Sequence, residues 1–211
     1  MSMFPIYLKL EGRACLVVGA GTIAAPKIES LLRAGGRVTV VAPRAADAIV
    51  QMHADGKVEW HERVFSSEDL DGKFLVVAAT DLQAVNHAVA EAARQRNVLC
   101  NSVDDPPDCD FFYPSVVQRG DLQIAISTAG KSPALSQRLR VELDRMLPAD
   151  AGAWLDALGE IRERILLAYP PSIERKEALH MLAQREICDA DVCPVQTRLN
   201  ELLQREGTQG R

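Results

Sequence analysis

A glycine-rich turn between an apolar run and a helix-like stretch constrains this chain more than any other feature. Residues 13–18 form a short, mainly apolar run, and the letters GAGTIA at 19–24 follow it directly. In such a turn the first glycine permits a tight bend, the second lets the backbone approach a pyrophosphate, and the small third residue lets the helix lie close to the sheet. The N–H groups at the helix start then attract the phosphates. The turn predicts a dinucleotide-binding α/β domain with Gly19 and Gly21 at the cofactor.

Further strand-like runs extend this pattern into a parallel sheet. They alternate with alanine-rich, helix-like stretches at 45–54 and 82–96, which is the order of a doubly wound fold. The strand-like runs lie at 13–18, 37–42, 57–60, 74–79 and 98–103. Residues 1–113 are therefore predicted to form one Rossmann-type domain.

The pattern changes after this domain. Strand-like runs at 115–118 and 122–127 enclose a turn-forming Arg-Gly-Asp sequence, which is typical of a hairpin. Ser132 followed by Pro133 predicts a helix start, and leucines at helical spacing mark one apolar face on that helix. Because a hairpin with one helix is too small to fold alone, residues 114–147 are predicted to form a small α+β dimerisation segment.

Residues 148–211 are predicted to form an all-helical domain. Apolar residues recur at helical spacing from Trp154 to Ile165, until a Pro-Pro pair ends the pattern. Two shorter amphipathic helices and a disordered tail are expected after it, at 172–187, 195–204 and 207–211.

The charge of the chain favours small-molecule partners. Its formal net charge of −5 and pI near 5.4 argue against a general binder of nucleic acid, which would carry a basic surface. Residues 115–147 are the exception, with five basic and three acidic side chains. Arg119, Lys131, Arg138 and Arg140 lie there, near a predicted helix start that attracts anions. An anionic substrate is expected at this segment.

Targeting signals and metal motifs are not apparent. The first residues lack the basic start, apolar run and cleavage site of a secretory signal, and no stretch reaches membrane-spanning length, so a cytoplasmic location is expected. The five cysteines form no CxxC pair, and three lie in or beside strand-like runs, which favours buried thiols over a metal or redox site. The four histidines show no paired spacing, so no metal site is predicted.

The ends of the second and fourth runs supply further cofactor candidates, because ligands of open α/β sheets bind outside the carboxyl ends of the strands. The carboxylate that commonly holds the adenosine ribose, about 20 residues after the turn, is missing here, and the second run ends at Pro43 and Arg44. Arg44 either meets a 2′-phosphate or is a solvated loop residue. Thr80 and Asp81 follow the fourth run, where they contact the cofactor or Thr80 caps the next helix.

Carboxylates crowd the loop after the fifth run, which contains Asp104, Asp105 and Asp108. Carboxylates that lie close together and shielded from water raise one another's pKa, which is one way to tune a general acid or base. The alternative is a solvated acidic loop, and spacing alone favours that alternative.

Seven short motifs occur together: FPIYL at 4–8, the glycine turn at 19–24, AATD at 78–81, VN at 85–86, CNSVD at 100–104, FYPS at 112–115 and STAGKSP at 127–133. Together they resemble the precorrin-2 dehydrogenase/sirohydrochlorin ferrochelatase family. The resemblance covers residues 4 to about 147 and is one of topology beyond them. It implies a homodimer of three-part subunits, in which a dimerisation segment is exchanged and the active site lies between the parts.

The resemblance also implies an activity. Such a protein oxidises precorrin-2 to sirohydrochlorin with NAD as hydride acceptor and then inserts Fe²⁺, its second substrate, to give siroheme. The position matching Asp104 is the catalytic aspartate, which handles protons in both steps. The missing ribose carboxylate is then a family trait. The implied cofactor contacts are Gly21, Thr22, Ile23, Pro43 and Arg44.

The predicted substrate contacts combine the basic segment with the family motifs. Thr128 stands where some members of the family carry serine. The predicted contacts are Asn101, Arg119, Ser127, Thr128, Lys131, Ser132 and Arg138. The longer siroheme synthases join a methyltransferase module to this unit, so methylation of uroporphyrinogen is expected of another protein.

Two other functions stay open from the residues alone. One is a dehydrogenase that leaves iron insertion to a separate chelatase, because the same base would serve both steps. The other is a non-catalytic NAD-sensing module, which leaves the hairpin and the helical region unexplained.

Overall fold

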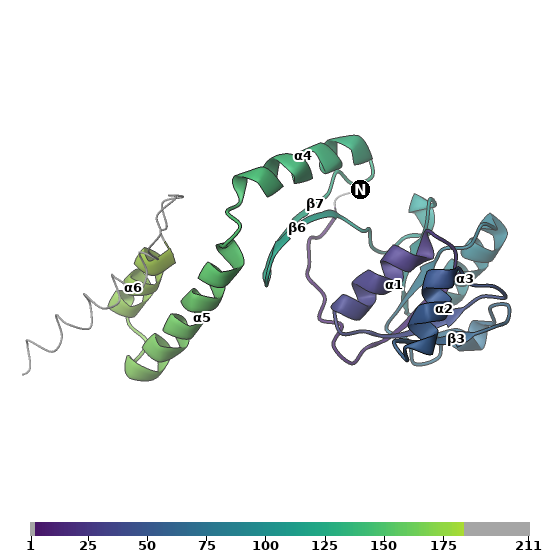
Figure 1. Ribbon diagram of the computed structural model, residues 1–211, viewed down its shortest axis with the longest axis horizontal. Coiled ribbons are helices and arrows are strands. Elements are labelled where there is room, and N and C mark those ends of the chain that lie inside the picture. Colours follow the sequence, from purple (N-terminus) through teal and green to yellow (C-terminus); the bar gives the residue numbers. More distant parts are fainter. Residues whose placement is uncertain (1–2, 184–211) are drawn as a thin grey trace, which may run out of the picture. The chain divides into compact units, whose positions relative to one another are not determined.

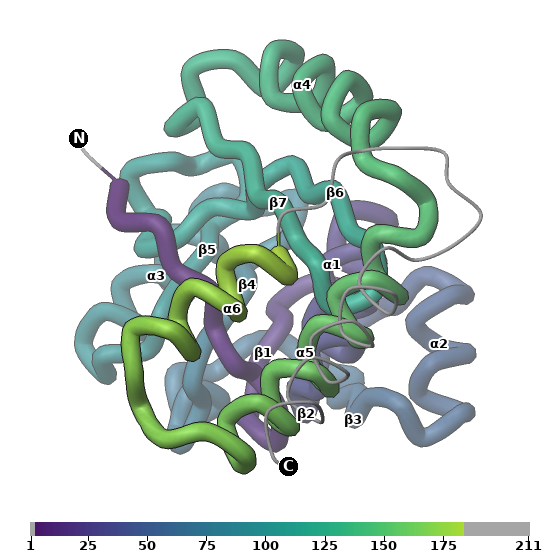
Figure 2. Tube along the Cα trace, turned by 90° about the vertical axis from the view of Figure 1, so that its left-hand side faces the viewer, coloured from purple at the N-terminus to yellow at the C-terminus, as the bar shows by residue number. Residues whose placement is uncertain are grey.

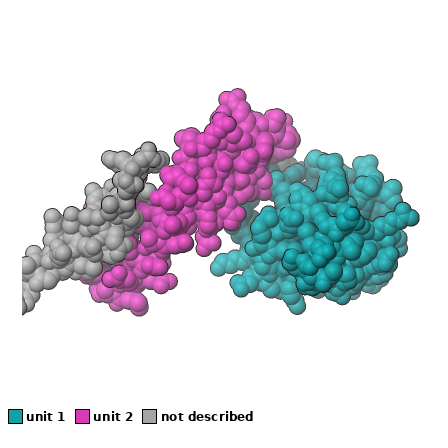
Figure 3. Space-filling view, in the orientation of Figure 1, with its two compact units in different colours: residues 1–113 teal, residues 114–211 magenta. Residues whose placement is uncertain are grey.

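The computed structural model describes residues 3–183. The chain divides into two compact units, residues 1–113 (unit 1) and residues 114–211 (unit 2), coloured separately in Figure 3. The elements of unit 1 are β1 (Ala14–Val18), α1 (Ala24–Arg33), β2 (Arg37–Val41), α2 (Asp47–Ala54), β3 (Val58–His61), the 3-10 helix η1 (Ser67–Leu70), β4 (Leu75–Ala78), α3 (Gln83–Arg96), β5 (Leu99–Ser102) and the 3-10 helix η2 (Pro106–Asp108).

The five strands of unit 1 form one parallel sheet in the order β3-β2-β1-β4-β5, which the labels of Figure 2 follow across the unit. The chain leaves β1 toward β2 and β3, then returns to the other side of β1 for β4 and β5. This reversal between β1 and β4 is the topological switch point where such sheets bind ligands. The predicted α/β class with a parallel sheet is confirmed.

Helices cover both faces of this sheet (Figure 1). Val17 packs in one cluster with Ile28 of α1 and Ile49 of α2, whereas its neighbour Leu16 packs in another cluster with Val89 of α3. Successive strand residues point to opposite faces, so a strand buried on both sides needs an unbroken apolar sequence. This requirement explains why central strands such as β1 and β4 are visible in the sequence as continuous apolar runs.

Each strand bound lies within one residue of the predicted run. The third run was predicted at 57–60, and β3 lies at Val58–His61. The reason is the register with β2, which pairs Val58 with Val38 and His61 with Val41. A polar residue such as His61 can extend a parallel strand when the neighbouring strand extends equally far. The apolar character of the sequence does not show where this pairing ends.

Unit 2 begins with the predicted hairpin and helix. Ser132 caps α4 by accepting a hydrogen bond from the Leu135 N–H at 3.2 Å, which confirms the predicted helix start. Its elements are β6 (Ser115–Arg119), β7 (Leu122–Ile126), α4 (Pro133–Met146), α5 (Ala151–Ala168) and α6 (Ile173–Ala183). The predicted helix at 172–187 is seen as far as Ala183. The helix predicted at 195–204 and the tail at 207–211 lie outside the described residues.

The apolar face predicted for α4 is largely open within unit 2. Leu135 is 45% exposed and Met146 is 67% exposed, while the buried residue of this helix is Ser136. The hydroxyl of Ser136 lies 3.3 Å from that of Ser115 on β6. The separation of 114–147 from the helices that follow stays a prediction. Within residues 3–183, no helix is both long enough and apolar enough to span a membrane.

Candidate cofactor and substrate site

A cavity of about 750 Å³ opens at the carboxyl edge of the sheet in unit 1. It is lined by the residues that follow β1, β2, β3 and β4 and by the first turns of α3. Thr22 and Ile23 lie in the turn before α1 and are not among its lining residues. Six predicted cofactor residues do line it: Gly19, Gly21, Pro43, Arg44, Thr80 and Asp81.

The two glycines of the turn differ in their surroundings. Gly19 has a φ of +102°, and a Cβ there would lie 2.3 Å from the carbonyl oxygen of Ala79, so the fold itself excludes a side chain. A Cβ at Gly21 would meet nothing within 4 Å. The first turn of α1 is closed by its own backbone, because the Ala24 and Ala25 N–H groups donate to the Gly21 carbonyl at 3.1 and 3.3 Å and Pro26 has no N–H. The open side of Gly21 is thus the approach left for an anion. The open space beside Gly21 therefore fits a pyrophosphate.

Thr80 has a local structural role. Its hydroxyl donates to Asn86 Oδ1 at 2.7 Å and accepts from the Leu82 N–H at 3.3 Å. Asn86 also donates to the Thr80 carbonyl at 3.0 Å, and it is only 5% exposed. These bonds fix the turn between β4 and α3 at the rim of the cavity. The site residues predicted from the sequence did not include Asn86, although a polar residue on an alanine-rich helix face was a usable signal.

The cavity wall after β2 carries no carboxylate. Pro43 and Arg44 line it there, and Asp81 alone carries a carboxylate among the described lining residues. The Ala42 carbonyl accepts a hydrogen bond from the Trp60 indole at 3.0 Å, which fixes the end of β2. An adenosine ribose in this position meets backbone and Arg44 rather than an acidic side chain.

Val64 and Phe65 also line the cavity, and sequence reasoning missed them. They follow β3, whose carboxyl end lies at the same sheet edge as those of β1, β2 and β4. That shared edge was the signal, because every loop after a parallel strand of this sheet is a candidate ligand contact.

Asp104 lies in a turn directly after β5. The Asp105 N–H donates to the Ser102 carbonyl at 3.3 Å, and Asp104 has a φ of +61°. Its side chain is exposed. Left-handed backbone is uncommon for residues other than glycine, but Asp and Asn adopt it more readily than most. The turn presents Asp104 at the sheet edge.

Two of the carboxylates near Asp104 in the chain have partners of their own. Asp108 is buried, and its oxygens lie 2.5 Å from His87 Nδ1 and 3.4 Å from Arg94 Nη2. Asp110 accepts a hydrogen bond from the Cys100 N–H at 2.9 Å. The loop is thus not wholly solvated, because Asp108 is buried.

Lys27 is the cationic neighbour of Asp104. Its Nζ lies 3.9 Å from the centroid of the Tyr113 ring, a cation–π contact. Burial lowers the pKa of Lys27, while the negative charge of Asp104 acts in the opposite direction. Burial also raises the pKa of Tyr113 to about 12, so this phenol is neutral at physiological pH. Sequence reasoning did not connect Lys27 with Asp104.

Asn101 supports the same region from inside. Its side chain is 7% exposed, and Nδ2 donates to the Phe111 carbonyl at 2.8 Å. Together with the bond from the Asp110 N–H to the Cys100 carbonyl at 2.7 Å, it holds residues 109–113 against β5. Tyr113 is thereby placed beneath Lys27.

The three cysteines of the described residues are free thiols, and burial favours a structural role for them. Cys15 and Cys100 are buried, and burial raises the pKa of Cys100 to about 12. Cys109 donates to the Ser102 carbonyl at 3.1 Å. Cys188 and Cys193 lie outside the described residues. Residues 3–183 hold no group of three or more His, Cys, Asp and Glu side chains able to bind a metal ion.

In unit 2, hydroxyl groups brace the loop before α4. Thr128 Oγ1 donates to the Ser132 carbonyl at 3.1 Å and accepts from its N–H at 3.3 Å. Ser127 Oγ accepts from the Ala129 N–H at 3.1 Å. Threonine supplies the hydroxyl that these contacts need, so the loop is closed without serine at 128. Lys131 is exposed at its end.

Three basic side chains of unit 2 have polar partners within the unit. Arg119 bonds the carboxylate of Asp144 at 2.9 Å, and Arg138 bonds Glu142 at 2.8 Å. Arg140 donates to the side-chain oxygen of Gln137 at 3.2 Å. The sequence predicted an excess of positive charge here, and these contacts neutralise part of it. The prediction counted the acidic residues of α4 but could not place them beside Arg119 and Arg138.

Comparisons with known proteins agree with this geometry. The model of an NAD(P)-binding family matches residues 6–115, and the model described as sirohaem biosynthesis protein central matches residues 119–146. A solved structure, SirC, precorrin-2 dehydrogenase, is 32% identical, with a TM-score of 0.74 and 98% of both chains covered. This chain belongs to the family of that precorrin-2 dehydrogenase. The resemblance noted in the sequence is confirmed.

Curated members of the family include much longer proteins. Siroheme synthase 1 of Pectobacterium atrosepticum is 46% identical and the siroheme synthase of Photorhabdus laumondii is 42% identical, each over 165 residues. The match covers 78% of this chain and 34% or 35% of these relatives. The chain therefore spans about a third of the length of the curated family members it matches.

Proposed function

We propose that this protein is an NAD-dependent precorrin-2 dehydrogenase of siroheme biosynthesis. The match to SirC, precorrin-2 dehydrogenase, over 98% of both chains carries this proposal. The glycine-lined cavity at the switch point supports it, because its open space at Gly21 suits a dinucleotide. Gly19, Pro43, Arg44, Thr80 and Asp81 would border the cofactor there, with Thr22 and Ile23 at the adjoining helix start.

Oxidation of precorrin-2 to sirohydrochlorin removes one hydride and one proton from the tetrapyrrole. NAD, when bound, would supply the acceptor for the hydride. Asp104 accepts the proton as a general base, a role worth about 10²–10⁴ in rate. Lys27 places a cation near this carboxylate.

The proposal extends to iron insertion. Entry of Fe²⁺ into sirohydrochlorin displaces two pyrrole N–H protons, and an exposed carboxylate beside the macrocycle would take them one at a time. The names of the curated siroheme synthases favour this second activity. A dehydrogenase without chelatase activity is the second candidate, favoured by the name of SirC.

The peripheral carboxylates of the tetrapyrrole need cationic and N–H donors. Within unit 2, the loop before α4 offers hydroxyl groups, an exposed Lys131 and a helix N-terminus. We include in this proposed substrate site of unit 2 Arg119, Ser127, Thr128, Lys131, Ser132 and Arg138. Asn101 of unit 1 is proposed as a separate substrate contact.

Substitution of Asp104 tests the mechanism. Asp104→Asn is the preferred variant, because asparagine also tolerates the left-handed backbone of this position. We expect it to retain NAD affinity and thermal stability and to lose at least about 100-fold in the rate of sirohydrochlorin formation. The measurement is absorbance during incubation of the purified protein with precorrin-2 and NAD, with NADP in parallel, before and after addition of Fe²⁺.

Asp105→Asn is the matched control, since it changes the neighbouring carboxylate in the same turn, and it should leave both rates within about twofold. Full activity of Asp104→Asn would contradict the assignment. If the wild-type protein forms siroheme after Fe²⁺ is added, and no siroheme forms without the protein, the bifunctional enzyme is favoured. If only sirohydrochlorin forms, the dehydrogenase is favoured. NAD binding without turnover of precorrin-2 would indicate a sensing module.

A further inference from the structure

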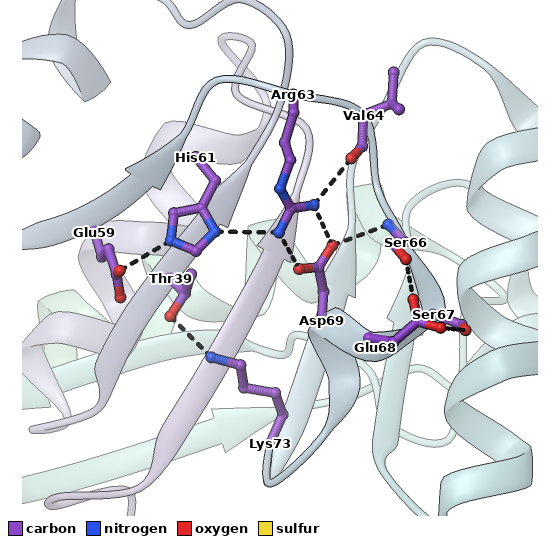
Figure 4. A network of polar contacts seen from close by, with 10 residues as sticks. All are labelled: Thr39, Glu59, His61, Arg63, Val64, Ser66, Ser67, Glu68, Asp69 and Lys73. Carbon is purple, nitrogen blue, oxygen red and sulfur yellow. Dashed lines mark hydrogen bonds and ion pairs between the residues drawn. The ribbon is translucent and has the colours of Figure 1, made fainter.

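The loop after β3, residues 62–66, is held by a polar network that the proposed mechanism does not use (Figure 4). Arg63 lies at its centre and faces the carboxylate of Asp69 on η1. Val64 and Phe65, which follow Arg63 in the chain, line the cavity. The network and the cavity wall therefore belong to one short segment.

The bond between Arg63 and Asp69 has two parallel contacts. Nη1 donates to Oδ2 at 2.8 Å and Nη2 donates to Oδ1 at 2.5 Å. Asp69 Oδ2 also accepts from the Ser66 N–H at 2.9 Å, and Arg63 Nη1 donates to the Val64 carbonyl at 3.1 Å. The backbone of Val64 and of Ser66 is therefore bonded to the same ion pair, which holds the residues between them in one conformation.

The same guanidinium is joined to the strand before it. Arg63 Nη2 lies 3.3 Å from His61 Nδ1, and His61 Nε2 lies 2.9 Å from Glu59 Oε1 (Figure 4). The Asp69 side chain is only 9% exposed, against 45% for Arg63. A bidentate Arg–carboxylate pair of this kind fixes orientation more strongly than a single surface contact.

The segment displays an apolar residue outward rather than into the core. Val64 is 72% exposed and lines the cavity together with Pro43 and Ala46 from the loop after β2. The adenosine half of a dinucleotide lies at the end of the second strand in folds of this type. An exposed valine held rigidly beside that position offers an apolar contact to a flat aromatic base.

We infer that Arg63 and Asp69 are positioning residues that hold Val64 and Phe65 as the wall for the adenine ring of NAD. A wall that is rigid before binding lowers the conformational entropy lost when the cofactor enters. The inference rests on the proposed binding of NAD in this cavity, and it is independent of the tetrapyrrole chemistry.

Binding of cofactor fragments to the full chain tests this inference. Isothermal titration calorimetry with NAD, AMP and nicotinamide mononucleotide compares the wild type with Arg63→Met and Asp69→Asn. We expect a roughly tenfold loss of affinity for NAD and AMP in both variants, and no change for nicotinamide mononucleotide. In turnover, the KM for NAD should rise while kcat stays constant.

Val64→Ser keeps the network intact and removes the apolar contact, so it should weaken AMP binding to a similar degree even if the other variants fold poorly. Lys73→Met is the matched control, because Lys73 bonds Thr39 at 2.9 Å beside the network without lining the cavity (Figure 4). It should bind all three probes like the wild type.

Two results would overturn the inference: unchanged AMP affinity in all three loop variants, or an equal loss for AMP and nicotinamide mononucleotide. A wild type that binds neither NAD nor AMP would instead remove the proposed cofactor site, and the inference with it. Loss of precorrin-2 turnover with intact AMP binding would count against the proposed reaction alone.

Discussion

Two glycines of one motif restrict substitution for different reasons. At Gly19 the backbone of Ala79 occupies the place of a Cβ, and φ is positive, so the fold needs glycine there. At Gly21 the place of a Cβ is open space, so the fold tolerates a side chain there, and glycine is needed only to leave room for the ligand. The motif in the sequence assigns both glycines to the cofactor, because it records residue types and not which neighbour each one meets.

Alanine at each glycine should separate the two reasons. Gly19→Ala should lower the free energy of unfolding by at least about 2 kcal/mol, because backbone must move. Gly21→Ala should change it by less than about 0.5 kcal/mol and weaken NAD binding at least about tenfold. Denaturant titration and calorimetry measure the two quantities. Equal stability of the two variants would contradict this division.

The candidate base was predictable and its surroundings were not. Asp104 followed a strand-like run and matched a family motif, which sufficed to select it. Lys27 lies on α1, far earlier in the chain, and approaches Asp104 only because β1 and β5 belong to one sheet with a shared helix layer. Periodicity predicts such a layer, but it does not predict which side chains of the layer meet a given loop.

At the scale of elements, α3 anchors the loop that carries Asp104. His87 and Arg94 project from this helix to Asp108, in the 3-10 helix directly after the Asp104 turn. The hydrogen bond and the charge of Asp108 raise the pKa of His87, with smaller contributions from Glu91 and Asp105. The anchor is therefore sensitive to pH.

This anchor should lose stability as pH rises. The pKa of His87 is raised in the folded state from its ordinary 6.5, so its contribution is complete below about pH 6.5 and falls as pH rises through the folded pKa. Denaturant unfolding should show a larger cost of His87→Gln at pH 6 than at pH 8.5. A cost independent of pH would contradict this.

An NMR titration of His87 gives the matched comparison. Asp108→Asn should lower its pKa more than Glu91→Gln does, because the hydrogen bond to Asp108 is the largest cause of the shift. If the two substitutions lowered the pKa of His87 equally, the hydrogen bond to Asp108 would not be the main cause of the raised pKa.

Most elements were predictable because their burial is simple. The central strands β1 and β4 are covered on both faces, so their sequences are continuous apolar runs, and α3 and α4 begin near clear signals. The segment at 62–66 was not predicted, because its shape depends on ion pairing between Arg63 and Asp69 rather than on a hydrophobic period. Polar networks of this kind leave no spacing rule in the sequence.

At the scale of the whole molecule, the hairpin of unit 2 has one covered face and one open face. Val117 is buried, whereas Val116 is 40% exposed and pairs with Ala125. A two-stranded sheet is marginally stable alone, and the open face of α4 adds apolar surface. These features support the proposed homodimer, in which a second copy covers the hairpin.

A dimer of this kind makes thermal unfolding depend on concentration. We expect the Tm to rise by about 3 °C for a hundredfold increase in protein concentration, because dissociation accompanies unfolding. Val116→Lys should remove this dependence, and Leu167→Lys, at an 89% exposed site on α5, should not. Scanning calorimetry measures it, with sedimentation as a check on mass. A constant Tm would argue for a monomer.

The left-handed backbone at Asp104 restricts which residue types can replace aspartate at that position. Most side chains strain a residue with a φ of +61°, so the practical alternatives are glycine, asparagine and aspartate. Of these only aspartate supplies a carboxylate that can accept a proton. A lineage that loses this carboxylate therefore reaches, at small conformational cost, a folded protein that still binds its nucleotide but has lost its proton acceptor. Sensor proteins could arise from enzymes of this fold by such a single step.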